Sequence, residues 1–140
     1  MALVTKENIF NYIPQRDPIC LVHKIYECSD ESTKTGFTIE NGHFFVSDGQ
    51  LTEAGIVEHM AQSCAAGAGY SSSLKNVPPK VGFIANIKDL VIHSLPKVGS
   101  EVITTVKLKA FVMNVTLVVI HSECNGIPIS DCEMKIFIQE

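Results

Sequence analysis

The sequence has no tryptophan, a single arginine and little charge of either sign. Of its 140 residues 19% are charged and the net charge is −4, which excludes a nucleic-acid binder with a broad basic face. No apolar run reaches the roughly 20 residues that span a bilayer. The first residues also lack the basic segment and apolar stretch of a secretory signal. With 46% hydrophobic residues the chain is not disordered, so we expect one cytoplasmic domain over residues 1–140.

The five cysteines lack the arrangement of a disulfide framework or a zinc site. Their number is odd, no Cys-x-x-Cys pair occurs, and no histidine cluster accompanies them. We expect free thiols that pack mostly as small apolar side chains. The sequence also lacks a phosphate-binding glycine loop that follows a strand, so we expect neither a metal nor a nucleotide cofactor.

The apolar pattern predicts an α+β chain with one long helix among many strands. Alternating or continuous apolar segments of strand length predict a curved antiparallel sheet, and the run without proline over residues 52–73 predicts a helix that the sheet wraps around. A short helix over residues 5–12 precedes them. We expect strands over residues 19–26, 34–40, 81–93, 101–110, 113–123 and 129–138, with the fifth buried on both faces and a tight turn at Asn125-Gly126 before the last.

The long helix carries one carboxylate in apolar company. Thr52 is a plausible N-cap, and Glu58 and Gln62 lie four positions apart, so both project from one face. A carboxyl group among apolar side chains suits a general acid near neutral pH. The alternative is that Glu58 forms a structural ion pair or caps a strand end.

The other candidates for catalysis are a histidine and a cysteine. His43 lies between a glycine and two phenylalanines at a strand end, where it could act as a base or be an ordinary loop residue. His59 projects about 100° away from Glu58 and should face a different neighbour. Cys64 is in apolar surroundings that favour an inert thiol, and no Gly-x-Ser-x-Gly elbow is present. The remaining histidines fall in strand patterns and are interpreted as structural.

Three short segments, in order, resemble one enzyme family. The first segment is Ile13-Pro14-Gln15-Arg16-Asp17-Pro18-Ile19-Cys20-Leu21-Val22, which resembles a Leu-Pro-His-Arg-x-Pro-x-x-Leu-Val opening. The second is Gly42-His43-Phe44, which resembles a Gly-His-Phe strand end. The third is Glu58-His59-Met60-Ala61-Gln62, which resembles a Glu-Ala-Met-Ala-Gln helix segment. These are motifs of the 3-hydroxyacyl-(acyl-carrier-protein) dehydratases of the hotdog superfamily. The chain is most similar to a divergent, hydroxymyristoyl-carrier-protein dehydratase-like branch found in bacterial lipid and polyene-pigment gene clusters.

The resemblance implies a fold, a reaction and a set of site residues. A central helix would lie inside a curled sheet, and two protomers would pair so that the histidine of one chain meets the carboxylate of the other. His43 would remove the α-proton of a (3R)-hydroxyacyl thioester, and Glu58 would protonate the departing hydroxyl to leave a trans-2-enoyl thioester. The backbone N–H of Gly55 would polarise the thioester carbonyl, with Gln62 as a further positioning residue. No cofactor is implied.

The loop between His43 and the helix departs from the family pattern, because it lacks prolines and is one residue longer. If Phe44, and not His43, occupied the position of the family's catalytic histidine, Glu58 would be the one residue left of the catalytic pair. Two alternatives therefore stay open, an acyl thioesterase and a non-catalytic hotdog subunit that shapes the tunnel of an active partner. The implied partners are a second hotdog subunit and an acidic acyl-carrier protein. The residues that could dock the carrier are Arg16, Lys75, Lys80 and Lys97.

Overall fold

The computed structural model describes residues 1–139 and contains one long helix and eight strands. A 3-10 turn, η1, precedes the first strand, and α1 separates the first four strands from the last four. The bounds are η1 Ile9–Asn11, β1 Lys24–Cys28, β2 Ser32–Thr38, β3 Val46–Ser47, β4 Gln50–Leu51, α1 Glu53–Leu74, β5 Val81–Ile92, β6 Glu101–Val112, β7 Val115–Cys124 and β8 Ile127–Gln139.

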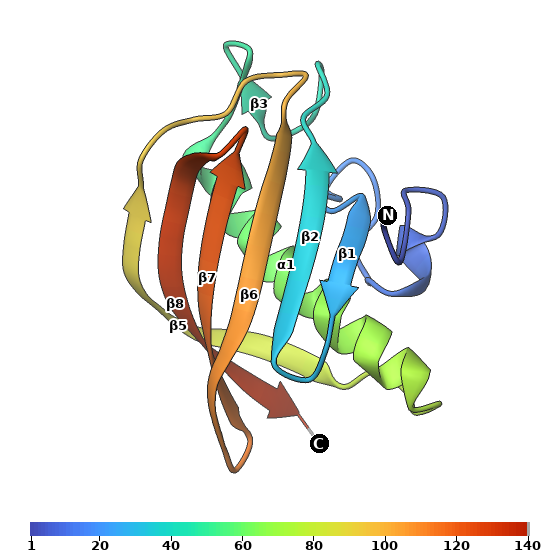
Figure 1. The fold of residues 1–140 in the computed structure, drawn as a ribbon. Helices are drawn as coiled ribbons and strands as arrows, with labels where there is room; N and C mark the ends of the chain where they lie inside the picture. Colours follow the sequence, from blue (N-terminus) through green and yellow to red (C-terminus); the bar gives the residue numbers. More distant parts are fainter. Residues whose placement is uncertain (140) are drawn as a thin grey trace.

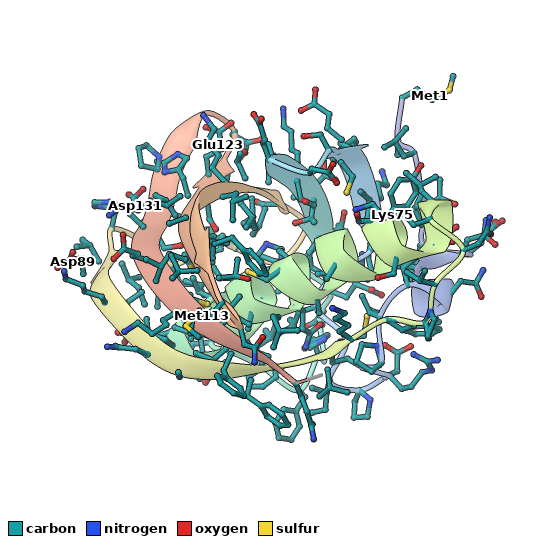
Figure 2. All side chains as sticks on the ribbon, turned by 90° about the horizontal axis from the view of Figure 1, so that it is seen from below. Met1, Lys75, Asp89, Met113, Glu123 and Asp131 are labelled. Atoms are coloured by element: carbon teal, nitrogen blue, oxygen red, sulfur yellow. The ribbon has the colours of Figure 1, made fainter. Side chains whose placement is uncertain are left out.

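Six strands form one antiparallel sheet in the order β1-β2-β6-β7-β8-β5, and β3 and β4 form a separate small hairpin. The sheet curves around α1, which lies against its concave face (Figure 1). Figure 2, from below, shows the helix within the curve. This arrangement is the hotdog fold, as the resemblance implied. No helix in the described part of the chain is long and apolar enough to cross a membrane.

Local signals explain the most accurately predicted elements. Thr52 caps α1, since its hydroxyl accepts a hydrogen bond from the N–H of Gly55 at 3.1 Å. Asn125 and Gly126 have φ values of 53° and 77°, the left-handed pair that a two-residue hairpin turn requires. Along β6, Val102, Thr104 and Val106 are buried in alternation, as the period of a strand with one covered face demands.

Several expected elements differ from the structure. The short helix over residues 5–12 is only the turn η1, and the first strand begins at Lys24 rather than residue 19. The β3–β4 hairpin was not predicted, although its turn residues Asp48 and Gly49 both have positive φ. The expectation that β7 is buried on both faces is wrong, because Val119 is 44% exposed on the outer face of the sheet, which no other layer formed by residues 1–139 covers.

The core lies between the concave face of the sheet and one side of α1. Its largest fully buried side chains include Phe37, Ile56, Met60, Ile120 and Met134. Close approach of the helix to the N-terminal segment depends on Gly69, because a Cβ there would overlap the carbonyl oxygen of Tyr12. A second, smaller cluster therefore packs the N-terminal residues against β1 and α1.

Candidate functional site

A cavity of about 1150 Å³ lies between α1, β5 and the concave face of the sheet. Its wall is mostly apolar: Ala61 and Cys64 come from α1, Ile84 from β5, and Leu108 and Val118 from β6 and β7. Glu58 is the carboxylate that α1 contributes to this wall. The cavity can therefore surround an extended apolar group and present it to a single helix carboxylate.

Glu58 is half-buried and is held by Gln62, as their spacing on one helix face predicted. The side-chain amide of Gln62 donates to Oε1 of Glu58 at 3.0 Å. One carboxylate oxygen is thus fixed to the helix, and this bond sets the orientation of the acid in the cavity.

Gln62 is itself fully buried, and both ends of its amide are occupied. Nε2 also donates to the carbonyl oxygen of Ile19 at 3.0 Å, and Oε1 accepts from the N–H of Leu21 at 2.6 Å. The described residues that line the cavity do not include Gln62. In this structure Gln62 holds Glu58, and a role in positioning substrate stays a prediction.

Residues 19–21 form a short segment, here called the strap, that connects both predicted catalytic residues. Besides its two bonds to Gln62, the strap offers the Cys20 carbonyl to Nε2 of His43 at 3.0 Å and the Leu21 carbonyl to Nδ1 of His59 at 2.7 Å. His43 and Glu58 are therefore fixed to the same three residues, His43 directly and Glu58 through Gln62.

Both ring nitrogens of the half-buried His43 have partners. Because a carbonyl only accepts, Nε2 carries the proton that bonds Cys20, and Nδ1 accepts from the N–H of Phe45 at 3.0 Å. His43 is not among the described residues that line the cavity around Glu58. The structure thus brings the two predicted residues to one scaffold without placing both in one cavity.

The Phe37 ring, which is fully buried, packs against three histidines. Its centroid lies 4.6 Å from that of His23, 5.5 Å from that of His43 and 6.1 Å from that of His59. The Phe37 ring meets the His43 ring nearly edge-on, at 77°, and so packs His43 against the core.

His59 is a residue whose importance the sequence reasoning missed. It is fully buried, and its Nε2 lies 2.7 Å from Oγ1 of Thr104, which lies 2.6 Å from Oγ of Ser122. Burial lowers the pKa of His59 to about 4, so the imidazole is neutral at physiological pH. The available signal was a histidine where the family motif has alanine.

Gly55 does not offer a free donor in this structure, because its N–H bonds the cap residue Thr52. A Cβ at Gly55 would lie 2.7 Å from Cδ1 of Leu51 and 2.8 Å from Cβ of Phe45, so the glycine lets the helix start approach the β3–β4 hairpin. A role in polarising a thioester carbonyl stays a prediction.

The five cysteines are free thiols, as expected. Burial raises the pKa of Cys64 to about 12 and that of Cys132 to about 11, so neither is a thiolate nucleophile near neutral pH. His93 and His121 flank Asp131 on the outer face of the sheet. Within residues 1–139, no cluster of three histidine, cysteine or acidic residues has the geometry to hold a metal ion.

Two of the four predicted docking residues reach the cavity. Arg16 and Lys80 line it, whereas Lys75 pairs with Asp30 at 3.4 Å. Lys97 lies elsewhere, at the bridge to Gln50. The guanidinium of Arg16 bonds the carbonyls of Phe10, Ile13 and Gln15, which keeps its charge at the cavity wall.

Comparisons with known proteins agree with this geometry. The model of the ApeP-like family, described as ApeP dehydratase, matches residues 7–126. A search of curated proteins finds no match. Among solved structures, the chain is similar to the dehydratase heterocomplex ApeI:P from Xenorhabdus doucetiae, with a TM-score of 0.84, 17% identity, and coverage of 94% of this chain and 91% of that chain.

Two further structures share the fold at lower similarity. An HP0420 homologue from Helicobacter felis has a TM-score of 0.71 and 12% identity, over 100% of this chain and 93% of that one. A hypothetical thioesterase from Streptococcus pneumoniae TIGR4, solved with coenzyme A, has a TM-score of 0.65 and 8% identity, over 82% of this chain and 84% of that one. At these identities the likeness establishes the fold alone.

Proposed function

The chain belongs to the ApeP-like dehydratase family, and from that premise we propose that it dehydrates a (3R)-hydroxyacyl thioester carried on an acyl-carrier protein to the trans-2-enoyl thioester. The observation that carries this proposal is the Glu58 carboxylate, which faces an apolar cavity of about 1150 Å³ while Gln62 fixes one of its oxygens. The cavity suits the acyl tail, and the carboxyl suits proton transfer to its hydroxyl.

The reaction needs an acid and a base. The base takes the proton from C2, the C2–C3 double bond forms, and the C3 hydroxyl leaves as water with a proton from Glu58. His43 is the proposed base. Its Nδ1 must first release the N–H of Phe45, a rearrangement that substrate binding can drive, because catalytic hydrogen bonds often realign in the complex.

We infer that the His43 that works with a given Glu58 belongs to a second hotdog subunit. His43 lies outside the described lining of its own chain's cavity, and β5 beside the cavity is an exposed, apolar sheet edge. The occupant that we propose for this edge is a second copy of the chain, because antiparallel pairing of β5 with itself satisfies the backbone of both. A related hotdog subunit, as in ApeI:P, is the alternative.

The carrier protein and its phosphopantetheine arm would approach the charged wall of the cavity. Arg16 and Lys80 are the proposed contacts, because both line the cavity and acyl-carrier proteins are acidic.

An acyl thioesterase is the second candidate. The observation in its favour is that Glu58 faces the cavity without His43, so the carboxylate could activate a water molecule by itself. A structure described as a hypothetical thioesterase also shares the fold.

Product analysis separates these functions. Purified protein is incubated with a 3-hydroxyacyl-carrier protein, and the carrier is followed by mass. Loss of one water from the thioester supports the dehydratase, and release of the free carrier thiol supports the thioesterase. A folded protein that does neither supports the non-catalytic subunit.

Subunit mixing tests the shared site. His43→Ala and Glu58→Gln are each inactive under the proposal, but mixed and exchanged subunits should recover about a quarter of the wild-type activity, because half of the dimers then hold one intact site. A mixture that stays inactive after proven exchange argues that both residues act within one chain.

A further inference from the structure

A line of buried hydrogen bonds crosses the core from the sheet to the strap. It runs from Ser122 to Thr104 on β7 and β6, then to His59 on α1, and ends at the carbonyl of Leu21. Ser122, Thr104, His59 and Leu21 are all fully buried. No water can replace a bond in this line without entering the core, so each member fixes the next.

The donor and acceptor of each hydrogen bond in this line follow from the Leu21 carbonyl at its end and from the neutral state of His59. The Leu21 carbonyl can only accept, so Nδ1 of His59 carries the proton and Nε2 must accept from the Thr104 hydroxyl. Thr104 then accepts from Ser122. The Leu21 carbonyl thus selects the tautomer of His59 that donates to the strap, and the sheet hydroxyls satisfy its other nitrogen.

Two bonds select the tautomer of His43, and the strap provides one of them. The Cys20 carbonyl, between the two strap residues that α1 holds, accepts from Nε2, and the N–H of Phe45 donates to Nδ1, which is therefore the nitrogen that can take up a proton. Gln62 holds the N–H of Leu21 and His59 holds its carbonyl, so loss of the His59 bond leaves that carbonyl unheld and lets the neighbouring Cys20 carbonyl shift.

We propose that His59 is a positioning residue that, through the strap, holds the Cys20 carbonyl on Nε2 of His43 and so favours the tautomer that is protonated there. The effect on turnover rests on the proposed function, in which His43 is the base. The effect on the His43 tautomer does not, so the two can be judged separately.

Two amide substitutions of His59 separate its two bonds. In His59→Asn the amide nitrogen lies at the position of Nδ1 and keeps a donor for Leu21. In His59→Gln the amide lies farther out, near Thr104, and Leu21 loses its donor. Thr35→Val is the matched control, because it removes another buried bond between sheet and helix, 2.8 Å from Thr35 to Ser63, without touching the strap.

The measurement is the ¹⁵N spectrum of the histidine side chains, with His43 assigned by its loss in His43→Gln. The wild type, His59→Asn and Thr35→Val should show His43 protonated at Nε2. His59→Gln should show a mixture of both tautomers, and kcat for dehydration should fall about 10- to 100-fold with KM nearly unchanged, as expected for a misplaced base.

A folded His59→Gln protein in which His43 stays wholly protonated at Nε2 overturns the inference, and so does a tautomer change in Thr35→Val. If His59→Gln does not fold, His59→Leu takes its place: it fills similar space but removes the donor to Leu21, and an unchanged His43 tautomer there overturns the inference equally. A wild type that forms no enoyl product would reject the proposed function, while the spectra still decide the role of His59.

Discussion

The two edges of the sheet are treated in opposite ways. At β1 the N-terminal residues cover the edge, because Leu3 and Val4 donate to the Ile25 carbonyl and Ile25 donates back to Val4. At β5 eleven of the twelve residues are exposed, among them Phe83, at 54%, and Val91, at 48%. Figure 1 shows β1 beside the N-terminal segment and β5 at the opposite margin.

This difference between the two edges indicates which edge binds a second subunit. Long, apolar, uncovered edge strands tend to pair with other chains. Within residues 1–139 the N-terminal segment covers the β1 edge, whereas β5 has irregular register at Ile84/Asn86 and Lys88/Val91 but no covering segment. The covered side carries the strap, Phe37 and His59, whose polar groups are paired. The uncovered side carries the β5 wall of the cavity that Glu58 faces, and the N-terminal segment and the turn between β1 and β2 provide another wall. We therefore propose that the β1 side maintains the geometry and stability of the site, and that the β5 side admits the second subunit.

The largest expected effect is on the uncovered side. In Glu58→Gln the amide still accepts the bond from Gln62 but no longer transfers a proton. We expect turnover to fall by about 10²- to 10⁴-fold, with a change in the free energy of unfolding below about 0.5 kcal/mol. Glu53→Gln, an exposed acid on the first turn of the same helix, is the control and should keep its activity.

The next-largest effect is expected on the covered side, where a substitution should change stability rather than turnover. Phe37→Ala removes a fully buried ring from the centre of three histidines and should lower the free energy of unfolding by about 3–5 kcal/mol. Phe137→Ala, where the ring is 46% exposed, should cost far less. Urea unfolding of both proteins checks this, and equal losses would contradict the division between the two sides.

A smaller effect is expected at the β5 edge itself. Ile87→Lys with Val91→Lys places charges on exposed edge positions, where they repel their copies across a two-fold axis. We expect the dissociation constant for self-association to rise about 10- to 100-fold, with the monomer still folded. Val119→Lys, at an exposed position in the middle of the sheet, should not weaken association. Analytical ultracentrifugation measures all three proteins.

The pH dependence of stability depends on the buried histidines of the covered side. The folded protein holds the pKa of His59 at about 4 through burial, against an ordinary value of 6.5, so protons bind the unfolded state first. Stability is then complete above pH 6.5 and falls as the pH drops toward 4, by about 2 kcal/mol at pH 5. Burial also lowers the pKa of His23, which adds in the same direction. Urea unfolding of His59→Asn should show a shallower fall between pH 6.5 and 5, and an unchanged fall would contradict this source.

The parts of the fold that were predicted depend on local patterns. The cap at Thr52, the turn at Asn125-Gly126 and the pair Glu58–Gln62 each involve residues within four positions of one another. Propensity, turn chemistry and helix spacing all act over that range.

The connections that organise the site act over longer distances. His59 reaches Leu21 across 38 positions and Thr104 across 45, and His43 reaches Cys20 across 23. Only the curvature of the sheet brings these residues together, so residues 19–23 looked like a strand when read by their apolar pattern. The same limit applied to β7, whose apolar residues suggested burial on both faces although Val119 is exposed on the outer face.

Hydrogen–deuterium exchange of the two edges, measured as protein concentration rises from the dissociated to the assembled state, tests the central claim most directly. The account predicts that amides of β5 become protected on assembly while those of β1 are unchanged. Assembly detected by light scattering in the same samples, with β5 still exchanging freely, would show that the second subunit binds elsewhere and would contradict the account.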